Sequence, residues 1–278
     1  EVGTGGPVRQ AQGLSESQRP PVRGHAGRVS LPWFTRLASS LRAWWQNPRP
    51  ALWVLLALAV VLFLRKPHAL LTPQLWAEDG SVFLNENDEL GLRAFFTPYM
   101  GYLHALPRLV AWLSAHLLDP RWWPAFYNGV AFVLWVAVLA RFLSPRFDLP
   151  GKPWLILAFL LVPHNGEIFF NVTNLQWLTG FVLIQQAIIA APQTTAQRVG
   201  DLATLAVVGL TGPFVVAFLP LFAWRWWRTR DTDSAAALAL TAACAAVQAA
   251  FILGAPEVSS TVLNLSPLRW WEGFTVVT

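Results

Sequence analysis

The chain has 278 residues, of which 55% are hydrophobic and only 13% are charged. Soluble domains carry about 25% charged residues, so this balance argues against a soluble globular protein. The formal net charge is +5, but the basic residues fall in short clusters between apolar blocks. That pattern is typical of cytoplasmic loops and argues against binding of nucleic acid. We therefore expect an all-α, polytopic transmembrane helix bundle.

Residues 1–30 are rich in Gly, Pro, Gln, Ser and Arg, a composition that cannot bury a core and predicts disorder. Residues 31–50 mix Trp, Leu and Arg, which predicts a basic interfacial helix beside anionic lipid headgroups. We therefore divide the chain into a basic N-terminal arm, residues 1–49, and a transmembrane bundle, residues 50–278. Because the chain begins with Glu1 and stops in a fresh polar-to-apolar transition, we expect a fragment whose bundle is incomplete at the C-terminus.

Apolar runs mark the segments expected to enter the membrane. The first run, residues 51–64, covers roughly 21 Å as a helix, which is short of the hydrocarbon core of about 30 Å. Several later runs are also too short to cross alone, and their short ends fall beside polar segments. We therefore expect a bundle built around a water-filled cavity at its outer end. The expected runs in chain order are residues 51–64, 124–143, 154–162, 168–191, 202–211, 214–227 and 235–253.

Residues 102–118 are ambiguous. His104, Arg108 and His116 recur there at helical spacing, which predicts a helix with one polar face. This helix either lies on the membrane surface or crosses the membrane with its polar face on a cavity. A surface-lying helix leaves most Lys and Arg residues on the cytoplasmic side together with the N-terminus, whereas a crossing helix would turn the later basic clusters outward. We therefore expect a surface-lying helix within a long first outer loop.

This orientation brings four polar segments to the outer end of the bundle. They are the acidic stretch 68–98, the polar knot 163–167, the Thr-Gly-Pro break at 211–213 and the tail 255–278. The break separates two short apolar runs, so it predicts a shallow hairpin that opens outward. A plain turn would give the same pattern.

Glu78 and Asp79 are the first candidates for chemistry. Two adjacent carboxylates close to a membrane span are costly unless they face water or a polar pocket. A carboxylate held at the membrane surface can act as a general base toward a hydroxyl or bind a hard divalent cation. The alternative is a helix N-terminus, where acidic residues favour the first turn.

The knot His164-Asn165-Gly166-Glu167 is the second candidate, and polar residues continue after it. Irregular backbone at membrane depth persists only inside protein or beside a water-filled cavity, so the knot predicts the floor of such a cavity. The alternative is an ordinary polar loop, with Asn171 and Asn174 forming hydrogen bonds between helices. The further candidates for binding substrate are Asn171, Asn174, Gln176 and Trp177.

A third group of polar side chains lies at and just before the ambiguous helix. It consists of Tyr99, Tyr102, His104 and Arg108. The guanidinium of Arg108 could clamp a phosphate or extend to lipid headgroups.

The combination of an acidic pair after the first span, a juxtamembrane helix at 102–118 and a second acidic position at Glu167 resembles the GT-C superfamily of membrane glycosyltransferases. The short paired runs around the break at 211–213 are also similar to the paired short spans of that superfamily. The resemblance covers roughly residues 50–278 and is architectural. The chain departs from the oligosaccharyltransferase branch because no C-terminal acceptor-binding domain is recognisable.

The resemblance implies an inverting transfer of a sugar from a polyprenyl-phosphate donor to an acceptor at the outer face of the membrane. Asp79 or Glu78 would take the proton of the acceptor hydroxyl. The leaving phosphate would be stabilised by Arg108, Arg269 or a divalent cation, Mg²⁺ or Mn²⁺, held by Asp79 and Glu167. The implied partners are the lipid bilayer, the lipid-linked sugar and a glycan, lipid or protein acceptor. The implied location is the cell (inner) membrane, with multiple passes and a cytoplasmic N-terminus.

A transporter or flippase of lipid-linked saccharides is the alternative, because it would also need a polar cavity and broken helices. An internal repeat or charged residues deep in the spans would favour transport. The apolar runs are nearly free of charge, and no convincing repeat is visible in the sequence.

Overall fold

The computed structural model describes residue 3 and residues 48–149, 151–161 and 167–255. Within these ranges 77% of the residues are helical and no strand occurs, which confirms the all-α class. The expectations for the basic arm and its interfacial helix, and for the tail after residue 255, fall almost entirely outside these ranges. The described helices belong to one compact unit that begins at Trp44.

Polar side chains cap several of the helices. Thr194 accepts a hydrogen bond from the Gln197 N–H at the start of α9, and Asp231 accepts one from the Ser234 N–H at the start of α11, as N-cap residues do. The helices in chain order are α2 (Pro48–Arg65), α3 (His68–Leu71), η2 (Asp79–Leu84), α4 (Asn85–Leu90), η3 (Gly91–Phe96), α5 (Ala105–Leu117), η4 (Pro120–Trp122), α6 (Trp123–Ala140), η5 (Arg141–Leu143), α7 (Lys152–Leu161), α8 (Leu175–Ile188), α9 (Thr195–Gly209), α10 (Phe214–Thr229) and α11 (Thr232–Gly254).

Two apolar runs do not coincide with their helices. The run expected at 168–191 is helical only from Leu175, because the residues before it form a polar loop in which Asn171 accepts a hydrogen bond from the Asn174 N–H (2.9 Å). Asn side chains compete with helical hydrogen bonding in this way. The run expected at 202–211 belongs to a helix that begins earlier, at Thr195.

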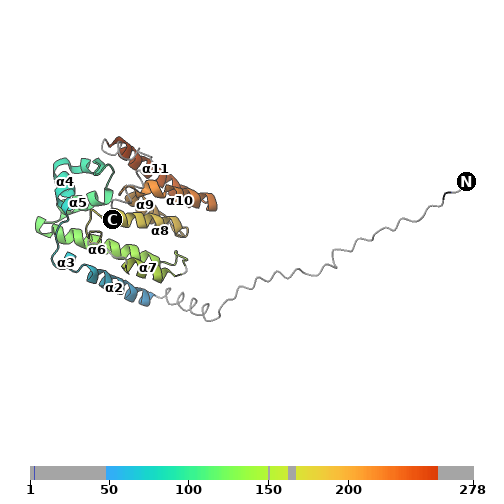
Figure 1. Cartoon of the computed structure of the whole chain (residues 1–278), viewed down its shortest axis with the longest axis horizontal. Helices are drawn as coiled ribbons and strands as arrows, with labels where there is room; N and C mark the ends of the chain where they lie inside the picture. The colour runs from blue at the N-terminus through green and yellow to red at the C-terminus, as the bar shows by residue number, and fades with distance from the viewer. Residues whose placement is uncertain (1–2, 4–47, 150, 162–166, 256–278) are drawn as a thin grey trace. The chain divides into compact units, whose positions relative to one another are not determined.

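Neighbouring helices pack side by side in a row. Helix α2 contacts α6, α6 contacts α8, α8 contacts α10, and α10 contacts α11 (Figure 1). Helix α9 contacts both α8 and α11. The short helices η2, η3 and α4 pack on α5 beside this row.

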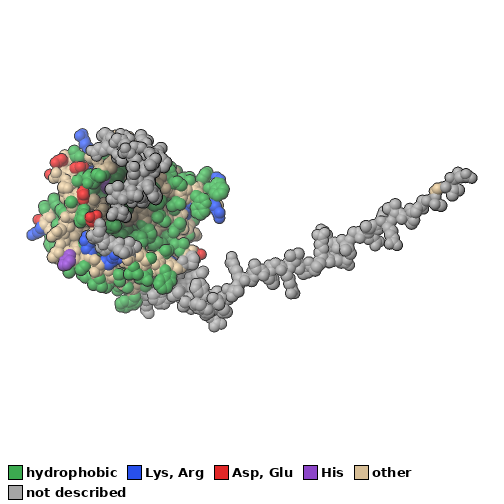
Figure 2. Space-filling model, viewed as in Figure 1, with side chains coloured by type: hydrophobic (Ala, Val, Ile, Leu, Met, Phe, Trp, Pro, Cys, Tyr) green, Lys and Arg blue, Asp and Glu red, His purple; other side chains and the backbone are tan. Residues whose placement is uncertain are grey.

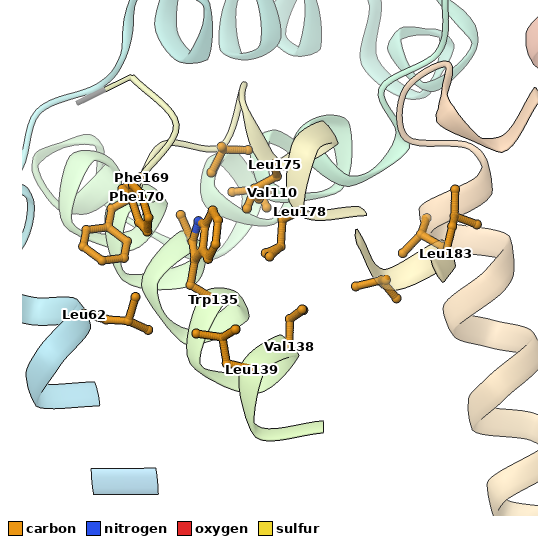
Figure 3. Packing of buried hydrophobic residues seen from close by; sticks show 14 of the residues in the cluster. Leu62, Val110, Trp135, Val138, Leu139, Phe169, Phe170, Leu175, Leu178 and Leu183 are labelled. Carbon is orange, nitrogen blue, oxygen red and sulfur yellow. The ribbon is translucent and has the colours of Figure 1, made fainter. Parts of the chain in front are cut away.

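The core joins these helices through aromatic and branched side chains (Figure 3). Trp135 on α6 stacks on Phe169, with ring centroids 4.5 Å apart, and Phe159 on α7 stacks on Phe181 of α8 at 4.3 Å. Leu62 of α2 is fully buried in the same cluster. Because these residues come from four helices and one loop, the core fixes the loop 167–174 against the bundle.

Within the described part of the chain, two helical segments are long and apolar enough to cross a membrane, Pro120–Leu143 and Thr232–Gly254. Only 39% and 22% of their most apolar windows are buried inside the protein, so most residues of each window are at least partly exposed. Leu52, Trp53 and Leu64 on α2 are also exposed, and apolar side chains cover much of the face shown in Figure 2. Uncovered apolar surface of this kind indicates association with a membrane.

One group of helix ends meets in what we call the acidic end, residues 66–104, 167–176 and 209–213. Lys66 Nζ donates to the Phe169 carbonyl (2.9 Å). In Figure 2, the Asp and Glu side chains gather over α4, which belongs to this end.

The opposite helix ends meet in what we call the basic end, residues 141–152, 186–201 and 225–233. Arg146 pairs with Asp201 (2.5 Å), and Arg198 pairs with Asp233 (2.5 Å). These contacts join the loop after α6 to α9, and α9 to the start of α11. Lys and Arg side chains are visible at the end of α10 in Figure 2.

Helix α5 connects the acidic end to the start of α6. At its start, the Ala105 N–H donates to the Leu210 carbonyl (2.9 Å) beside the 211–213 break. Near its other end, the Ser114 carbonyl accepts from Trp123 Nε1 (3.0 Å) at the start of α6. Helix α5 thus packs between the 211–213 break and the start of α6, and whether it lies on a membrane surface stays a prediction.

Candidate functional site

Two of the four polar segments expected to converge, the acidic stretch and the 211–213 break, lie at the acidic end together with the loop that follows the knot, whereas the knot itself is described only at Glu167. Asp79 of η2 contacts the loop before α8, and Tyr102 Oη donates to Gln176 Oε1 at the start of α8 (2.8 Å). The 211–213 break docks on the segment after Tyr102, where the Gly212 N–H donates to the Leu103 carbonyl (3.0 Å). The fourth segment, the tail after residue 255, lies outside the described residues.

Asp79 connects the acidic stretch 68–98 to the loop before α8. Its Oδ1 accepts hydrogen bonds from the Thr173 N–H (2.8 Å) and the Thr173 hydroxyl (2.7 Å), and its Oδ2 accepts from the Val172 N–H (3.3 Å). The side chain is completely buried, so it does not line an open cavity. Asp79 also stands in the first turn of a helical stretch that continues into α4, so the helix N-terminus expected as the alternative is present too.

Burial controls the protonation of Asp79. Desolvation raises the pKa of the carboxyl from 3.8 to about 6, although the hydrogen bonds from Thr173 and Val172 act in the opposite direction. Loss of water around a carboxylate disfavours its charged form. The group therefore titrates close to neutrality, where a general base is most effective.

Glu78 presents a different carboxylate. The residue is half-buried, and its Oε2 is enclosed without a hydrogen-bond partner among the described residues. Its charge is close enough to Tyr99 to contribute, after burial, to the raised pKa of that phenol. An enclosed carboxylate oxygen without a donor is costly, and it is free to accept a proton.

Arg108 is buried rather than extended toward headgroups. Only 1% of its side chain is exposed, and its Nη2 pairs with Glu86 (2.5 Å) and donates to the Thr97 carbonyl (3.1 Å). The guanidinium lies over the Phe83 ring, 5.0 Å from its centroid. Its Nε and Nη1 have no partner among the described residues, so the N–H groups of two nitrogens remain for an acceptor.

His104 shares this interior with three aromatic rings. It stacks on Tyr102, with centroids 4.5 Å apart, and lies 5.4 Å from Phe83 and 5.5 Å from Tyr99. Desolvation lowers the pKa of His104 to about 4, with the charge of Arg108 acting in the same direction. The imidazole is therefore neutral near pH 7.

The polar face expected on residues 102–118 is divided. His104 and Arg108 are buried at the start of α5, whereas His116 is exposed and its Nδ1 faces the Trp112 carbonyl at 2.8 Å. The periodic pattern was correct for the first two residues only, because η2 and α4 cover one end of the helix face and leave the other uncovered.

Residues 167–174, which end the knot and follow it, form a loop held by their own side chains. Asn171 donates to the Glu167 carbonyl, and Asn174 donates to the same oxygen (3.0 Å). The hydrogen bonds between helices expected from these two residues are therefore not the ones they make. Glu167 is exposed, and Trp177 is half exposed against Phe214. His164, Asn165 and Arg269 lie outside the described residues.

The break at 211–213 is more than a plain turn. Thr211 Oγ1 accepts from the Leu106 N–H (3.0 Å), and the Thr211 carbonyl accepts from Thr179 (2.9 Å). Gly212 has φ of 91°, and a Cβ there would stand 3.0 Å from the Gln176 Cβ, so both its conformation and its surroundings favour glycine. The break thus links α5, α8 and α9.

The residues expected to hold Mg²⁺ or Mn²⁺ do not fit a metal ion. Among the described residues there is no group of three His, Cys, Asp or Glu side chains that could bind one. The Asp79 oxygens face three hydrogen-bond donors, and divalent oxygen-ligand sites usually need several free oxygens. The pairing of Asp79 with Glu167 in such a site was therefore wrong for this arrangement.

Two residues of this region were missed from the sequence. Glu86 pairs with Arg108, which lies 22 positions away, and the local sequence pattern does not predict that contact. Gln248 on α11 binds both the N–H and the carbonyl of Leu103, at 2.8 and 3.1 Å. The Gln248 side chain is a lone amide in an Ala-rich apolar helix. This could have predicted a contact with another helix, because such residues usually form hydrogen bonds across helices.

No protein-family model, curated protein or solved structure matches the chain. Its function is therefore inferred from the chemistry of the residues themselves.

Proposed function

We propose that this chain is a multi-pass membrane glycosyltransferase of the GT-C type, which moves a sugar from a polyprenyl-phosphate donor to an acceptor hydroxyl at the outer face of the membrane. The observation that carries the proposal is the Asp79–Thr173 contact. It joins the acidic pair of the first polar loop to the polar loop before α8. A purely structural bundle has no need to gather these groups at one end.

The membrane arrangement follows from the charges. The basic end, with Arg146, Arg198 and Arg225, would face the cytoplasm, because positive residues mark that side. The acidic end would then face outward, and α5 would lie along the surface there. The apolar surfaces of α2, α7 and α11 would face lipid.

In the proposed reaction, the hydroxyl oxygen of the acceptor attacks the anomeric carbon of the sugar. The bond from that carbon to the phosphate oxygen breaks, and its electron pair stays on the leaving lipid phosphate. The hydroxyl proton passes to Glu78, whose Oε2 lacks a donor, and later to water. The configuration at the anomeric carbon is inverted.

Asp79 has a positioning role in this scheme. Its oxygens are already engaged by Val172 and Thr173, so it holds the second loop beside Glu78. The unpartnered N–H groups on Nε and Nη1 of Arg108 are suited to an anionic acceptor such as a phosphate oxygen.

The test is a sugar-transfer assay with the full chain in proteoliposomes and a panel of radiolabelled polyprenyl-phosphate sugars. Glu78→Gln should lower transfer by about 10²- to 10⁴-fold, the usual effect of removing a general base. Asp88→Asn is the matched control, because Asp88 is an exposed carboxylate on α4 and should leave transfer unchanged.

The outcomes separate the alternatives. Loss of transfer with Asp79→Asn but not with Glu78→Gln would keep the function and assign the base to Asp79. Wild-type transfer in both variants would overturn the proposal. Movement of a labelled lipid-linked sugar between leaflets without any glycosylated product would identify a flippase instead.

A further inference from the structure

A cleft of about 300 Å³ opens at the basic end, away from the acidic residues just described. It lies between the loop that follows α6 and the first turns of α9. Its polar lining consists of Arg141, Ser144, Arg146, Gln197, Asp201 and Thr204.

The two arginines of the cleft differ in their partners. Arg146 binds both oxygens of Asp201, at 3.1 and 2.5 Å, and donates to the Ala190 carbonyl (2.7 Å). Arg141 makes no ion pair with a described residue, and its Nε is enclosed without a hydrogen-bond partner. The one carboxylate that lines the cleft is hydrogen-bonded to Arg146 and acts on Arg141 through its charge alone, so the two arginines of the lining face a single negative charge.

Two further donors face the same space without an acceptor of their own. Ser144 Oγ accepts from the Arg146 N–H (3.3 Å), which leaves its own hydrogen free to donate. Gln197 Oε1 accepts from the Gln193 N–H (2.7 Å), while its Nε2 has no partner among the described residues. A surplus guanidinium with a hydroxyl and an amide donor is the chemistry that binds a phosphate.

The position of the cleft identifies the kind of phosphate. Arg141 lies at the end of the apolar segment Pro120–Leu143. On α10, Trp224 and Trp227 are 57% and 60% exposed, and Arg225 of the same helix donates to the Gln186 carbonyl (2.6 Å) at the same basic end. Exposed Trp residues gather at the level of lipid headgroups, so the cleft would open at that depth.

We infer that this cleft binds a phosphate group, and that an anionic phospholipid headgroup supplies it. Free phosphate has the same chemistry and is the other possible source. The inference does not depend on the proposed transferase activity, because the cleft and the acidic pair lie at opposite ends of the bundle.

The test measures binding of phosphatidylglycerol to the purified full chain in detergent by native mass spectrometry, with thermal shift as a second readout. Arg141→Met should weaken binding by about tenfold or more, since hydrogen bonds to charged groups contribute about 1.5–3 kcal/mol. Arg228→Met is the matched control, because Arg228 is an exposed arginine at the same end and should leave binding unchanged.

Gly200 provides a second test that removes no existing contact. It lines the cleft, and a Cβ built there would meet no atom within 4 Å. Gly200→Glu should abolish binding by placing a negative charge beside Arg141, whereas Gly200→Gln, of the same size, should retain part of it.

Phosphatidylcholine, inorganic phosphate and glycerol 3-phosphate serve as competing probes. Binding of phosphatidylglycerol that inorganic phosphate does not displace would support the lipid headgroup. Equal affinity for inorganic phosphate would support the site and assign it to free phosphate. Unchanged binding in both Arg141→Met and Gly200→Glu, or equal weakening by Arg228→Met, would overturn the inference.

Discussion

Replacing Asp79 with Asn should change how the stability of this protein depends on pH. In the wild type, burial raises the pKa of Asp79 from 3.8 to about 6, so folding takes up a proton between these values. The stabilisation is complete below pH 3.8 and is lost as the pH rises through 6. At about 1.4 kcal/mol per pKa unit, the loss is roughly 3 kcal/mol.

His104 acts in the opposite direction. Burial lowers its pKa from 6.5 to about 4, so folding releases a proton between these values. The stabilisation is complete above pH 6.5 and is lost as the pH falls through 4, again by roughly 3 kcal/mol. Over pH 4–6 the two groups oppose each other, and together they should leave the stability of the wild type nearly level.

Asp79→Asn removes the contribution of Asp79 to the pH dependence of stability and leaves that of His104. The variant should become more stable as the pH rises from 4 to 6, with a gain in the apparent Tm on the order of 5–10 °C if about 2–4 °C correspond to each kcal/mol. His104→Gln should show the reverse slope. The assay is thermal unfolding in one detergent at one heating rate, with Asp88→Asn as an exposed carboxylate control.

A pH profile of Asp79→Asn that runs parallel to that of the wild type would refute this reasoning. It would mean that Asp79 is not buried in the folded protein, or that the two proton equilibria do not belong to these groups. The measurement does not depend on knowledge of any substrate.

Three other substitutions have expected outcomes that thermal unfolding can check. Gly209→Ala should destabilise the protein, because the new Cβ would stand 2.9 Å from the Cys244 Cβ. Gly129→Ala is its control: the new Cβ meets open space, and the substitution should stabilise the protein by up to about 1 kcal/mol through helix propensity. Equal effects of the two substitutions on stability would contradict the close approach of α9 and α11. Glu86→Gln should cost about 3 kcal/mol by leaving the buried Arg108 charge unpaired, and a double variant with Arg108→Met should recover much of the loss. Gln248→Leu should lower the stability by about 1–3 kcal/mol, because it leaves the buried Leu103 N–H without an acceptor. An unchanged stability would mean that this N–H is in contact with water.

Composition and local pattern predicted much of the architecture. Blocks of apolar residues predicted α2, α6, α7, α10 and α11 close to their bounds in the structure, because side-chain chemistry and helical periodicity are local properties. The Thr-Gly-Pro break between α9 and α10 was also visible, since Pro and Gly interrupt helices wherever they occur. Counting basic residues favoured a surface-lying helix at 102–118; the structure confirms a helix there, Ala105–Leu117.

The candidate site could be predicted only in outline. The acidic pair could be recognised in the sequence because carboxylates are rare beside apolar runs. The different surroundings of Glu78 and Asp79 could not be recognised there. Asp79 is engaged by Thr173, 94 positions away, and adjacent residues on a helix point in different directions. The helical periodicity of the sequence does not predict a partner so far away in the chain.

The sequence by itself determined that the chain forms apolar helices with polar, acidic connections at one end and basic connections at the other. The tertiary structure decided which charges are compensated. Arg108 pairs with Glu86 and Arg146 pairs with Asp201, while Arg141 makes no direct ion pair with a described residue. The reason is physical: the cost of a buried charge depends on the groups that packing places within a few ångströms of it, and distant segments supply those groups.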